Sequence, residues 1–207
     1  MRCLKAMLVG TSLFLWVVSA LAQTEIIEAP KLVVGDRWER SNGRTYEVLG
    51  DEQGHYLVRM TRPGRVTEEL WNKVTLTSEK FRDPGKDFQV PMDPPEQTLL
   101  FPLTIGGKWG TTSRSATYGA HFARSYRVEA WEEVRIPVGT FKALRVRSDG
   151  RRMDTGYQFT EIYWYSPEVR GLLKANSTIA DARARAYMDF ELLRFTPGGQ
   201  KMIEIKP

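Results

Sequence analysis

The chain has 207 residues, with 30 Lys and Arg against 25 Asp and Glu, and a formal net charge of +5. A mild positive charge without a dense basic stripe argues against a nucleic-acid partner. The only cysteine is Cys3, which excludes an intramolecular disulfide, and the only histidines, His55 and His121, form no metal-binding motif. We therefore expect neither a metal nor a cofactor.

Residues 1–22 have the pattern of a cleaved signal peptide. A basic start is followed by the apolar run Met7–Val18 and by the small-x-small sequence Ala20–Ala22. An uncleaved anchor is the alternative, but this run is short for a span of about 20 residues. Cys3 precedes the run, so no lipid attachment is expected. The sequence predicts an exported protein, periplasmic or secreted, with no transmembrane segment in the mature chain.

The rest, 23–207, is predicted to be one all-β domain. Turn signals recur about every ten residues between short runs rich in aromatic and β-branched residues, a spacing typical of an antiparallel barrel or sandwich. The first half, about 31–80, begins with a hairpin around Asn42-Gly43, which we expect to be a type I′ turn. The segment of about 83–98 contains four prolines and is predicted to be a connection, because proline cannot donate to a ladder.

The second half, about 99–207, contains longer predicted strands. Residues 139–165 are predicted to be two strands around a turn at Asp149-Gly150. Only 168–188 has a loosely helical period, although Arg183 and Arg185 within it are expected to lie on one solvated strand face. Residues 187–195 are aromatic-rich and predict a strand.

The two halves resemble each other. The pattern "VGDRWER", "YEV", "GHYLVRM", "EELWNKV" in the first corresponds to "IGGKWGT", "YRV", "GTFKALRV", "EIYWYSP" in the second. A genuine repeat predicts two related β-meanders that form one barrel or sandwich, since neither can bury its apolar face alone; chance similarity is the alternative. Four tryptophans at corresponding positions are the predicted structural core: Trp38, Trp71, Trp109 and Trp164.

The stretch "GYQFTEIYWY" has two possible orientations, because side chains alternate along a strand. One face comprises Tyr157, Phe159, Glu161, Tyr163 and Tyr165. Each aromatic buries about 150–250 Å², worth up to about 4–6 kcal/mol at about 25 cal/mol/Å², which favours the aromatic row inside. A buried unpaired carboxylate costs several kcal/mol, so that row would need a partner for its glutamate or a wet cavity. An exposed, sugar-binding ribbon is the alternative.

Catalytic motifs are scarce. A glycan hydrolase needs two carboxylates about 5–10 Å apart, and Glu68 with Glu161 is the candidate pair, because both stand three residues before a tryptophan. A solvent-facing charge or a salt bridge is the simpler interpretation of each. No catalytic residue is assigned, and the protein is expected to be non-enzymatic.

Motifs of the second half resemble the TapB-like exported bacterial proteins of unknown function. These motifs are "LLFPLTIGGKW", "VRIPVGTFKALRV", "YWYSPEVRGLL" and "DFELLRF". The resemblance implies a barrel-like β-fold outside the cytoplasm and brings no established reaction. The expected function is a periplasmic binding or accessory protein of the cell envelope. Its partner would be a lipid, a glycan or an envelope protein, and an apolar or amphipathic ligand would lie in an aromatic-lined cavity. The ligand-binding candidates are Tyr157, Phe159, Glu161, Tyr163, Tyr165 and Glu68.

Overall fold

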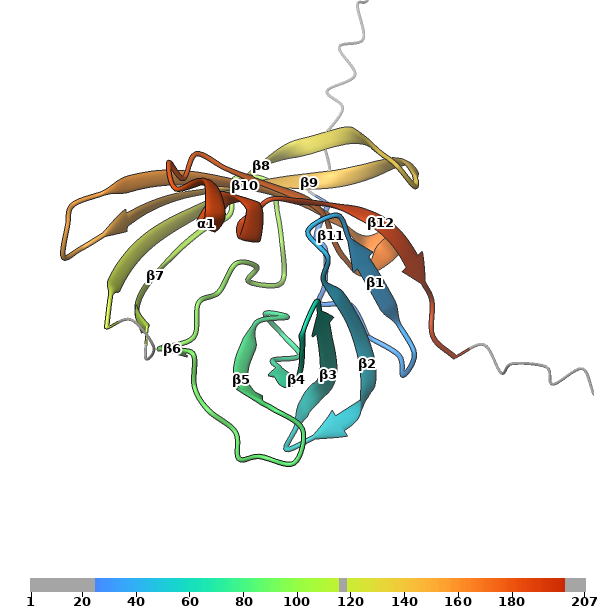
Figure 1. Cartoon of the computed structure of the whole chain (residues 1–207). Helices are drawn as coiled ribbons and strands as arrows, with labels where there is room; N and C mark the ends of the chain where they lie inside the picture. Colours follow the sequence, from blue (N-terminus) through green and yellow to red (C-terminus); the bar gives the residue numbers. More distant parts are fainter. Residues whose placement is uncertain (1–24, 116–118, 200–207) are drawn as a thin grey trace, which may run out of the picture.

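A single antiparallel sheet that curls into a nearly closed barrel accounts for most of the described chain (Figure 1). The computed structural model describes residues 25–115 and 119–199. The predicted signal peptide lies outside these residues. The all-β prediction is confirmed, with one short helix and one 3-10 turn as exceptions.

The first meander supplies five strands, each hydrogen-bonded to the next. They are β1 (Arg37–Arg40), β2 (Thr45–Glu52), β3 (His55–Arg62), β4 (Arg65–Trp71) and β5 (Ser78–Arg82). The hairpin predicted at Asn42-Gly43 joins β1 to β2. Of its two central residues only Gly43 has a positive φ, 78°, so the turn is not of type I′ as predicted.

The connection contributes β6 (Met92–Asp93), and the second half supplies the remaining strands. They are β7 (Lys108–Ser115), β8 (His121–Ile136), β9 (Gly139–Arg152), β10 (Gln158–Ser166), β11 (Gly171–Ser177) and β12 (Phe190–Thr196). The short η1 (Pro167–Val169) lies between β10 and β11, and α1 (Ala182–Met188) precedes β12.

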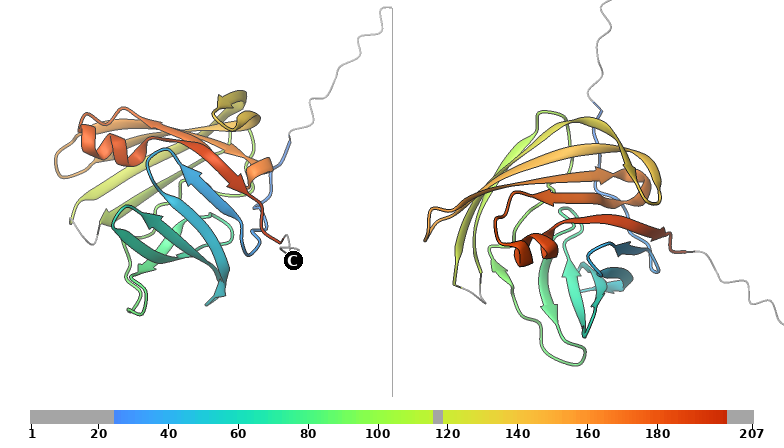
Figure 2. Two further views of the ribbon diagram at one scale, coloured as in Figure 1. Left: turned by 45° about the vertical axis from the view of Figure 1, so that its right-hand side comes forward. Right: turned by 45° about the horizontal axis from the view of Figure 1, so that its top comes forward.

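The last strand joins the two meanders. In the sheet order β5-β4-β3-β2-β1-β12-β11-β10-β9-β8-β7-β6, β12 lies between β1 and β11 and is antiparallel to both. Figure 2 shows the resulting arrangement, with the first meander (blue to green) curling beneath the wider second meander (yellow to red). The predicted connection of 83–98 runs from β5 past the two-residue β6. The sheet edges β5 and β6 therefore lie on either side of the one interruption in the barrel wall.

The internal repeat is visible in the ladder. Trp38 of β1 lies directly opposite Tyr46 of β2, and Trp109 of β7 lies directly opposite Tyr126 of β8. The Trp109 and Tyr126 rings stack with centroids 5.3 Å apart. Cross-strand pairs of this kind stabilise a sheet, so both meanders begin with the same aromatic rung.

The entry into each meander is also built in the same way. Gly35 and Gly106 have φ of 90° and 83°, values that favour glycine. Gly35 donates to the Val48 carbonyl (2.8 Å), and Gly106 donates to the Val128 carbonyl (2.9 Å). A register shift follows each valine. The two halves thus share a turn, an aromatic rung and a bulge.

Two sequence predictions on the second half are wrong. β9 continues through Asp149 and Gly150, and the chain turns only after Arg152. Most of 168–188 is not helical, because residues 171–177 form β11, in which Leu173 and Ala175 are buried at alternate positions. The helix is limited to Ala182–Met188, so the strand face expected for Arg183 and Arg185 is also wrong.

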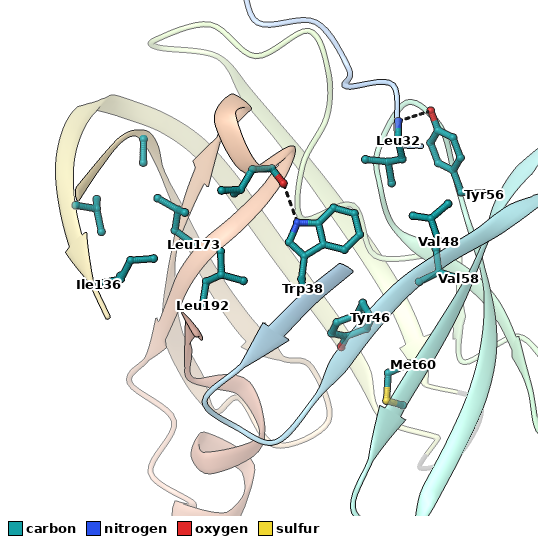
Figure 3. Packing of buried hydrophobic residues seen from close by; sticks show 13 residues of the cluster. Leu32, Trp38, Tyr46, Val48, Tyr56, Val58, Met60, Ile136, Leu173 and Leu192 are labelled. Carbon is teal, nitrogen blue, oxygen red and sulfur yellow. Dashed lines mark hydrogen bonds between the residues drawn. The ribbon is translucent and has the colours of Figure 1, made fainter. Parts of the chain in front are cut away.

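The interior contains two apolar clusters. The first surrounds Trp38, whose indole N–H donates to the Val169 carbonyl at 2.7 Å (Figure 3). The second surrounds Tyr126, Tyr163 and Tyr165. Of the four predicted core tryptophans, Trp38 is buried; Trp71 and Trp164 pack partly buried against the first cluster, and Trp109 against the second.

Candidate functional site: a polar cavity inside the barrel

The aromatic row of β10 faces the interior. Phe159, Tyr163 and Tyr165 are buried, and Glu161 between them is only 1% exposed. Tyr157, which precedes the strand, is 39% exposed, and its hydroxyl accepts a hydrogen bond from the Ala180 amide. The exposed aromatic ribbon is therefore excluded, and four of the five candidate residues of this row lie inside.

Glu161 belongs to a buried network of charges. Arg124 donates from Nε to Glu161 Oε2 (3.2 Å) and pairs through Nη1 with Glu96 Oε2 (3.0 Å). The Tyr126 hydroxyl donates to the other oxygen of Glu96 (3.0 Å). Arg124 thus links the β10 glutamate to the connection before β7, and supplies the partner that a buried Glu161 needs.

The network leaves one oxygen without a partner. Glu161 Oε1 is buried and accepts no hydrogen bond from the described residues. Burial raises the pKa of the Glu161 carboxyl, although Arg124 opposes this shift. Burial likewise raises the pKa of Tyr126 and of Tyr163, so both phenols stay protonated at neutral pH. These groups can donate and accept hydrogen bonds, but the tyrosines are poor bases.

Glu68 does not meet Glu161. It lies opposite exposed Arg59 in the ladder, and Arg82 Nε donates to it at 2.8 Å. Its neighbour Glu69 faces the interior, so Glu68 faces outward. The two glutamates that a hydrolase would need are on opposite faces of the sheet.

The spacing of the repeat explains this separation. Each glutamate stands three residues before a tryptophan, which places the two side chains on opposite faces of a strand. Trp71 points inward, where it stacks on Trp38 with centroids 6.4 Å apart. Trp164 lies on the face of β10 opposite to Tyr163 and Tyr165, and its indole N–H donates to Glu132 of β8 at 2.7 Å. The paired glutamates accordingly take opposite sides.

A cavity of about 330 Å³ lies between the two meanders. Aromatic walls come from Trp38, Tyr46, Trp71, Tyr163 and Phe190, and the polar lining comes from Arg40, Arg44, Glu69, Glu96 and Arg170 together with threonines and a serine. Of the row predicted on β10, only Tyr163 lines this space. The cavity is therefore centred on the first meander.

None of the three arginines in this lining was predicted, and two of them, Arg40 and Arg44, contact aromatic rings. The guanidinium carbon of Arg40 lies 4.5 Å from the Tyr46 ring centroid and 4.0 Å from that of Phe190. The guanidinium carbon of Arg44 lies 3.3 Å from the centroid of the Tyr187 ring. Arg40 and Arg44 each stand two residues from an inward-facing aromatic, Trp38 and Tyr46, so strand alternation places both arginines inside. The candidates chosen from the sequence were aromatic and acidic residues, which left this signal unused.

Glu69 is the acidic group near these arginines. It accepts a hydrogen bond from the Trp71 indole at 2.8 Å. Burial raises the pKa of the Glu69 carboxyl, with the Trp71 hydrogen bond opposing the shift. Burial also lowers the pKa of the Arg40 guanidinium. The cavity therefore combines aromatic surfaces with charges that are incompletely compensated.

A second depression, larger and more open, lies over strands β7 to β10. Its volume is about 610 Å³, and its lining includes Arg124, Gly150 and Phe159. The rest of its lining is dominated by threonine, serine and other small or polar residues. It lacks the enclosed aromatic walls of the first cavity, so it is the weaker candidate site.

Within 25–115 and 119–199, no group of three or more His, Cys, Asp or Glu residues has a geometry that could hold a metal ion. Among the same residues, no helix has both the length and the apolar character needed to cross a membrane.

Comparison with known proteins finds no relative. No family model matches the chain, no curated protein matches it, and no solved structure matches it. The resemblance to the TapB-like proteins therefore stays a prediction, and the site has to be interpreted from its own geometry.

Proposed function

We propose that this is a non-enzymatic, exported binding or accessory protein of the cell envelope, which holds a small amphipathic ligand inside its barrel. The observation that supports this most directly is the interior cavity, which combines aromatic walls with a polar lining that includes arginines and glutamates. Ligand pockets of about 300–1,000 Å³ typically combine apolar walls with a few polar groups. The cavity is at the small end of this range, which suits a ligand of modest size.

Export is supported by the sequence of residues 1–22, and the proposed periplasmic or secreted location rests on that segment alone. A non-enzymatic role is supported by the opposite facing of Glu68 and Glu161, which removes the candidate hydrolase pair. No observation favours a glycan hydrolase over a binding protein.

The test uses a neutral fluorescent probe, N-phenyl-1-naphthylamine. Binding inside the barrel should enhance its fluorescence and quench Trp38 and Trp71, both of which line the cavity. Thr98→Trp adds a large side chain to the lining and should abolish the enhancement. Val90→Trp is the matched control, because Val90 is exposed on the same connection and does not line the cavity.

Failure of the probe to bind, or equal binding to the Thr98→Trp variant, would contradict the proposal. Native mass spectrometry of protein purified from the envelope of its own host gives an independent check. A co-purified small molecule that is lost in Thr98→Trp would identify the ligand.

A further inference from the structure

Three arginines form a row across the first three strands. The Arg40 amide donates to the Arg44 carbonyl (2.9 Å), so these residues are neighbours in the β1–β2 hairpin. Thr45 lies opposite Thr61 in the β2–β3 ladder, which places Arg62 across from Arg44. Arg40 and Arg44 line the cavity, and Arg62, the last residue of β3, continues the row beyond the lining residues.

All three guanidinium groups have unused donors. Arg40 Nε, Arg44 Nη2 and Arg62 Nε are buried and have no hydrogen-bond partner among the described residues. Aromatic rings hold the first two in place, and Tyr187 lies beside both Arg44 and Arg62, with guanidinium carbons 3.3 Å and 5.9 Å from its centroid. Ring contacts thus position the arginines while these three N–H donors stay without a partner among the described residues.

This arrangement is unfavourable without a ligand. Like charges directly opposite each other on neighbouring strands destabilise a sheet, and buried donors without partners add a desolvation cost. Glu69 is the carboxylate whose charge acts on Arg40, and it is already hydrogen-bonded to Trp71. The row therefore brings three guanidinium groups together with one nearby carboxylate.

We propose that the row Arg40–Arg44–Arg62 binds a phosphate group, carried by the small amphipathic molecule that occupies the aromatic cavity. This inference rests on the proposed binding function and specifies the chemical class of the ligand. A phosphate monoester has a charge of about −1.5 to −2 at neutral pH, which matches the site. A carboxylate, with one negative charge, would leave part of the row uncompensated.

The geometry suits this assignment. Arginine forks recognise phosphate oxygens through paired N–H donors, and the guanidinium planes here are held by ring contacts rather than by ion pairs. The rings of Trp38, Trp71 and Phe190 provide the surface for the apolar part of the ligand. Recognition therefore divides between the arginine row and the aromatic walls of the cavity.

The experiment measures binding of hexyl phosphate, inorganic phosphate and hexanoate by isothermal titration calorimetry on the mature chain at neutral pH. We expect hexyl phosphate to bind most tightly and to displace N-phenyl-1-naphthylamine. Hexanoate tests the charge match, and inorganic phosphate tests whether the alkyl chain is needed.

Arg44→Gln and Arg62→Gln should each weaken hexyl phosphate binding by about 10- to 100-fold, the loss expected for hydrogen bonds to a charged group. Arg44→Lys, which keeps the charge without the fork, should recover part of the affinity. Arg59→Gln is the control, because Arg59 is exposed on the outer face of the same strand. The two Gln variants should also unfold at the same temperature as the parent or higher, because a repulsive charge is removed.

Hexyl phosphate affinity that is unchanged in both Gln variants would overturn the inference. If inorganic phosphate binds as tightly as hexyl phosphate, the ligand needs no apolar group and the site is one for free phosphate. If hexanoate binds more tightly than hexyl phosphate, the phosphate assignment is overturned. In each of these cases the neutral probe still binds and is still excluded by Thr98→Trp, so the proposed function stands. Loss of neutral-probe binding would instead remove the proposed function itself.

Discussion

At the scale of single residues, Glu161 is the group whose environment departs most from that of a surface glutamate. It is an acid with a raised pKa, held by Arg124 and near Glu96, Tyr126 and Tyr163. Such an acid stabilises the fold fully below its ordinary pKa of 4.5, and that contribution is lost as pH rises through the raised value. Stability should therefore depend on pH through this residue.

Glu161→Gln removes this dependence. Relative to the parent, the variant should gain stability as pH is raised from about 4 to about 8. The gain should be about 1.4 kcal/mol for every pH unit by which folding raises the pKa of Glu161. Urea unfolding across this range measures the difference, with Ile162→Val on the outer side of the same strand as a non-titrating control. Parallel stability curves for the Gln variant and the parent would contradict the prediction.

Gly150 belongs to a strand, where a turn was predicted, because it packs against an aromatic ring. A Cβ at this position would lie 2.4 Å from ring atoms of Phe159, so the absence of a side chain makes room for the aromatic row. Gly150→Ala should destabilise the fold by about 1–3 kcal/mol through overpacking. Gly50→Ala is the control, because nothing lies within 4 Å of its Cβ position, and it should change stability by less than about 0.5 kcal/mol. Equal effects in denaturant unfolding would refute the explanation.

At the scale of elements, the sequence predicted the strands and the repeat better than it predicted which side of the sheet each side chain faces. The Trp38–Tyr46 and Trp109–Tyr126 rungs follow from matching spacings, because hairpin partners are fixed by local register. Which side Trp164 takes depends on its packing against strands distant in sequence, and no local pattern encodes this. The pairing of Glu68 with Glu161 rested on their equal distance in sequence from a tryptophan. That distance does not determine which side of the sheet each glutamate faces.

The arginine row was missed for a related reason. Arginines at strand ends are usually interpreted as solvated charges. The aromatic rings that cover these arginines are brought to them only when the barrel closes. The β1–β2 hairpin was predicted, so the proximity of Arg40 and Arg44 was accessible from the sequence. Their contacts with Phe190 and Tyr187 were not, since these residues lie more than a hundred positions further along the chain.

Asp36 anchors the start of β1 to two distant elements. Its carboxylate accepts from the amides of Val33 and Gly198 and pairs with Arg170 at 2.7 Å. Asp36→Ala should lower the free energy of unfolding by about 2–4 kcal/mol, because the amides of Val33 and Gly198 lose a buried hydrogen-bond acceptor. The loss of the ion pair adds less, because Arg170 is partly exposed and can be solvated.

Glu39→Ala is the control for Asp36→Ala. Glu39 belongs to the same strand and forms an exposed pair with Arg37, so a change of less than about 0.5 kcal/mol is expected. A comparable loss in both variants, measured by denaturant unfolding, would show that Asp36 has no special anchoring role.

At the scale of the whole molecule, β12 decides whether the two meanders form one body. It separates β1 from β11 and pairs with both, so the first and second halves have no shared ladder without it. Each meander alone leaves an apolar face uncovered. We therefore expect the barrel to unfold as one cooperative unit.

A chain that ends at Asp189 lacks β12 and should lose the cooperative unfolding transition, as monitored by circular dichroism and tryptophan fluorescence. A chain that ends at Gly199 keeps all twelve described strands and should unfold cooperatively. A sharp transition in the shorter chain would mean that the meanders associate without the joining strand.

The position of β12 has a further consequence for the way such a protein is made. Synthesis from the amino end produces β1 early, whereas β12 follows every other described strand. The sheet therefore cannot be completed until β12 has been made, and until then β1 and β11 each keep one unpaired edge. The cavity between the meanders should accordingly form only in a late step of folding.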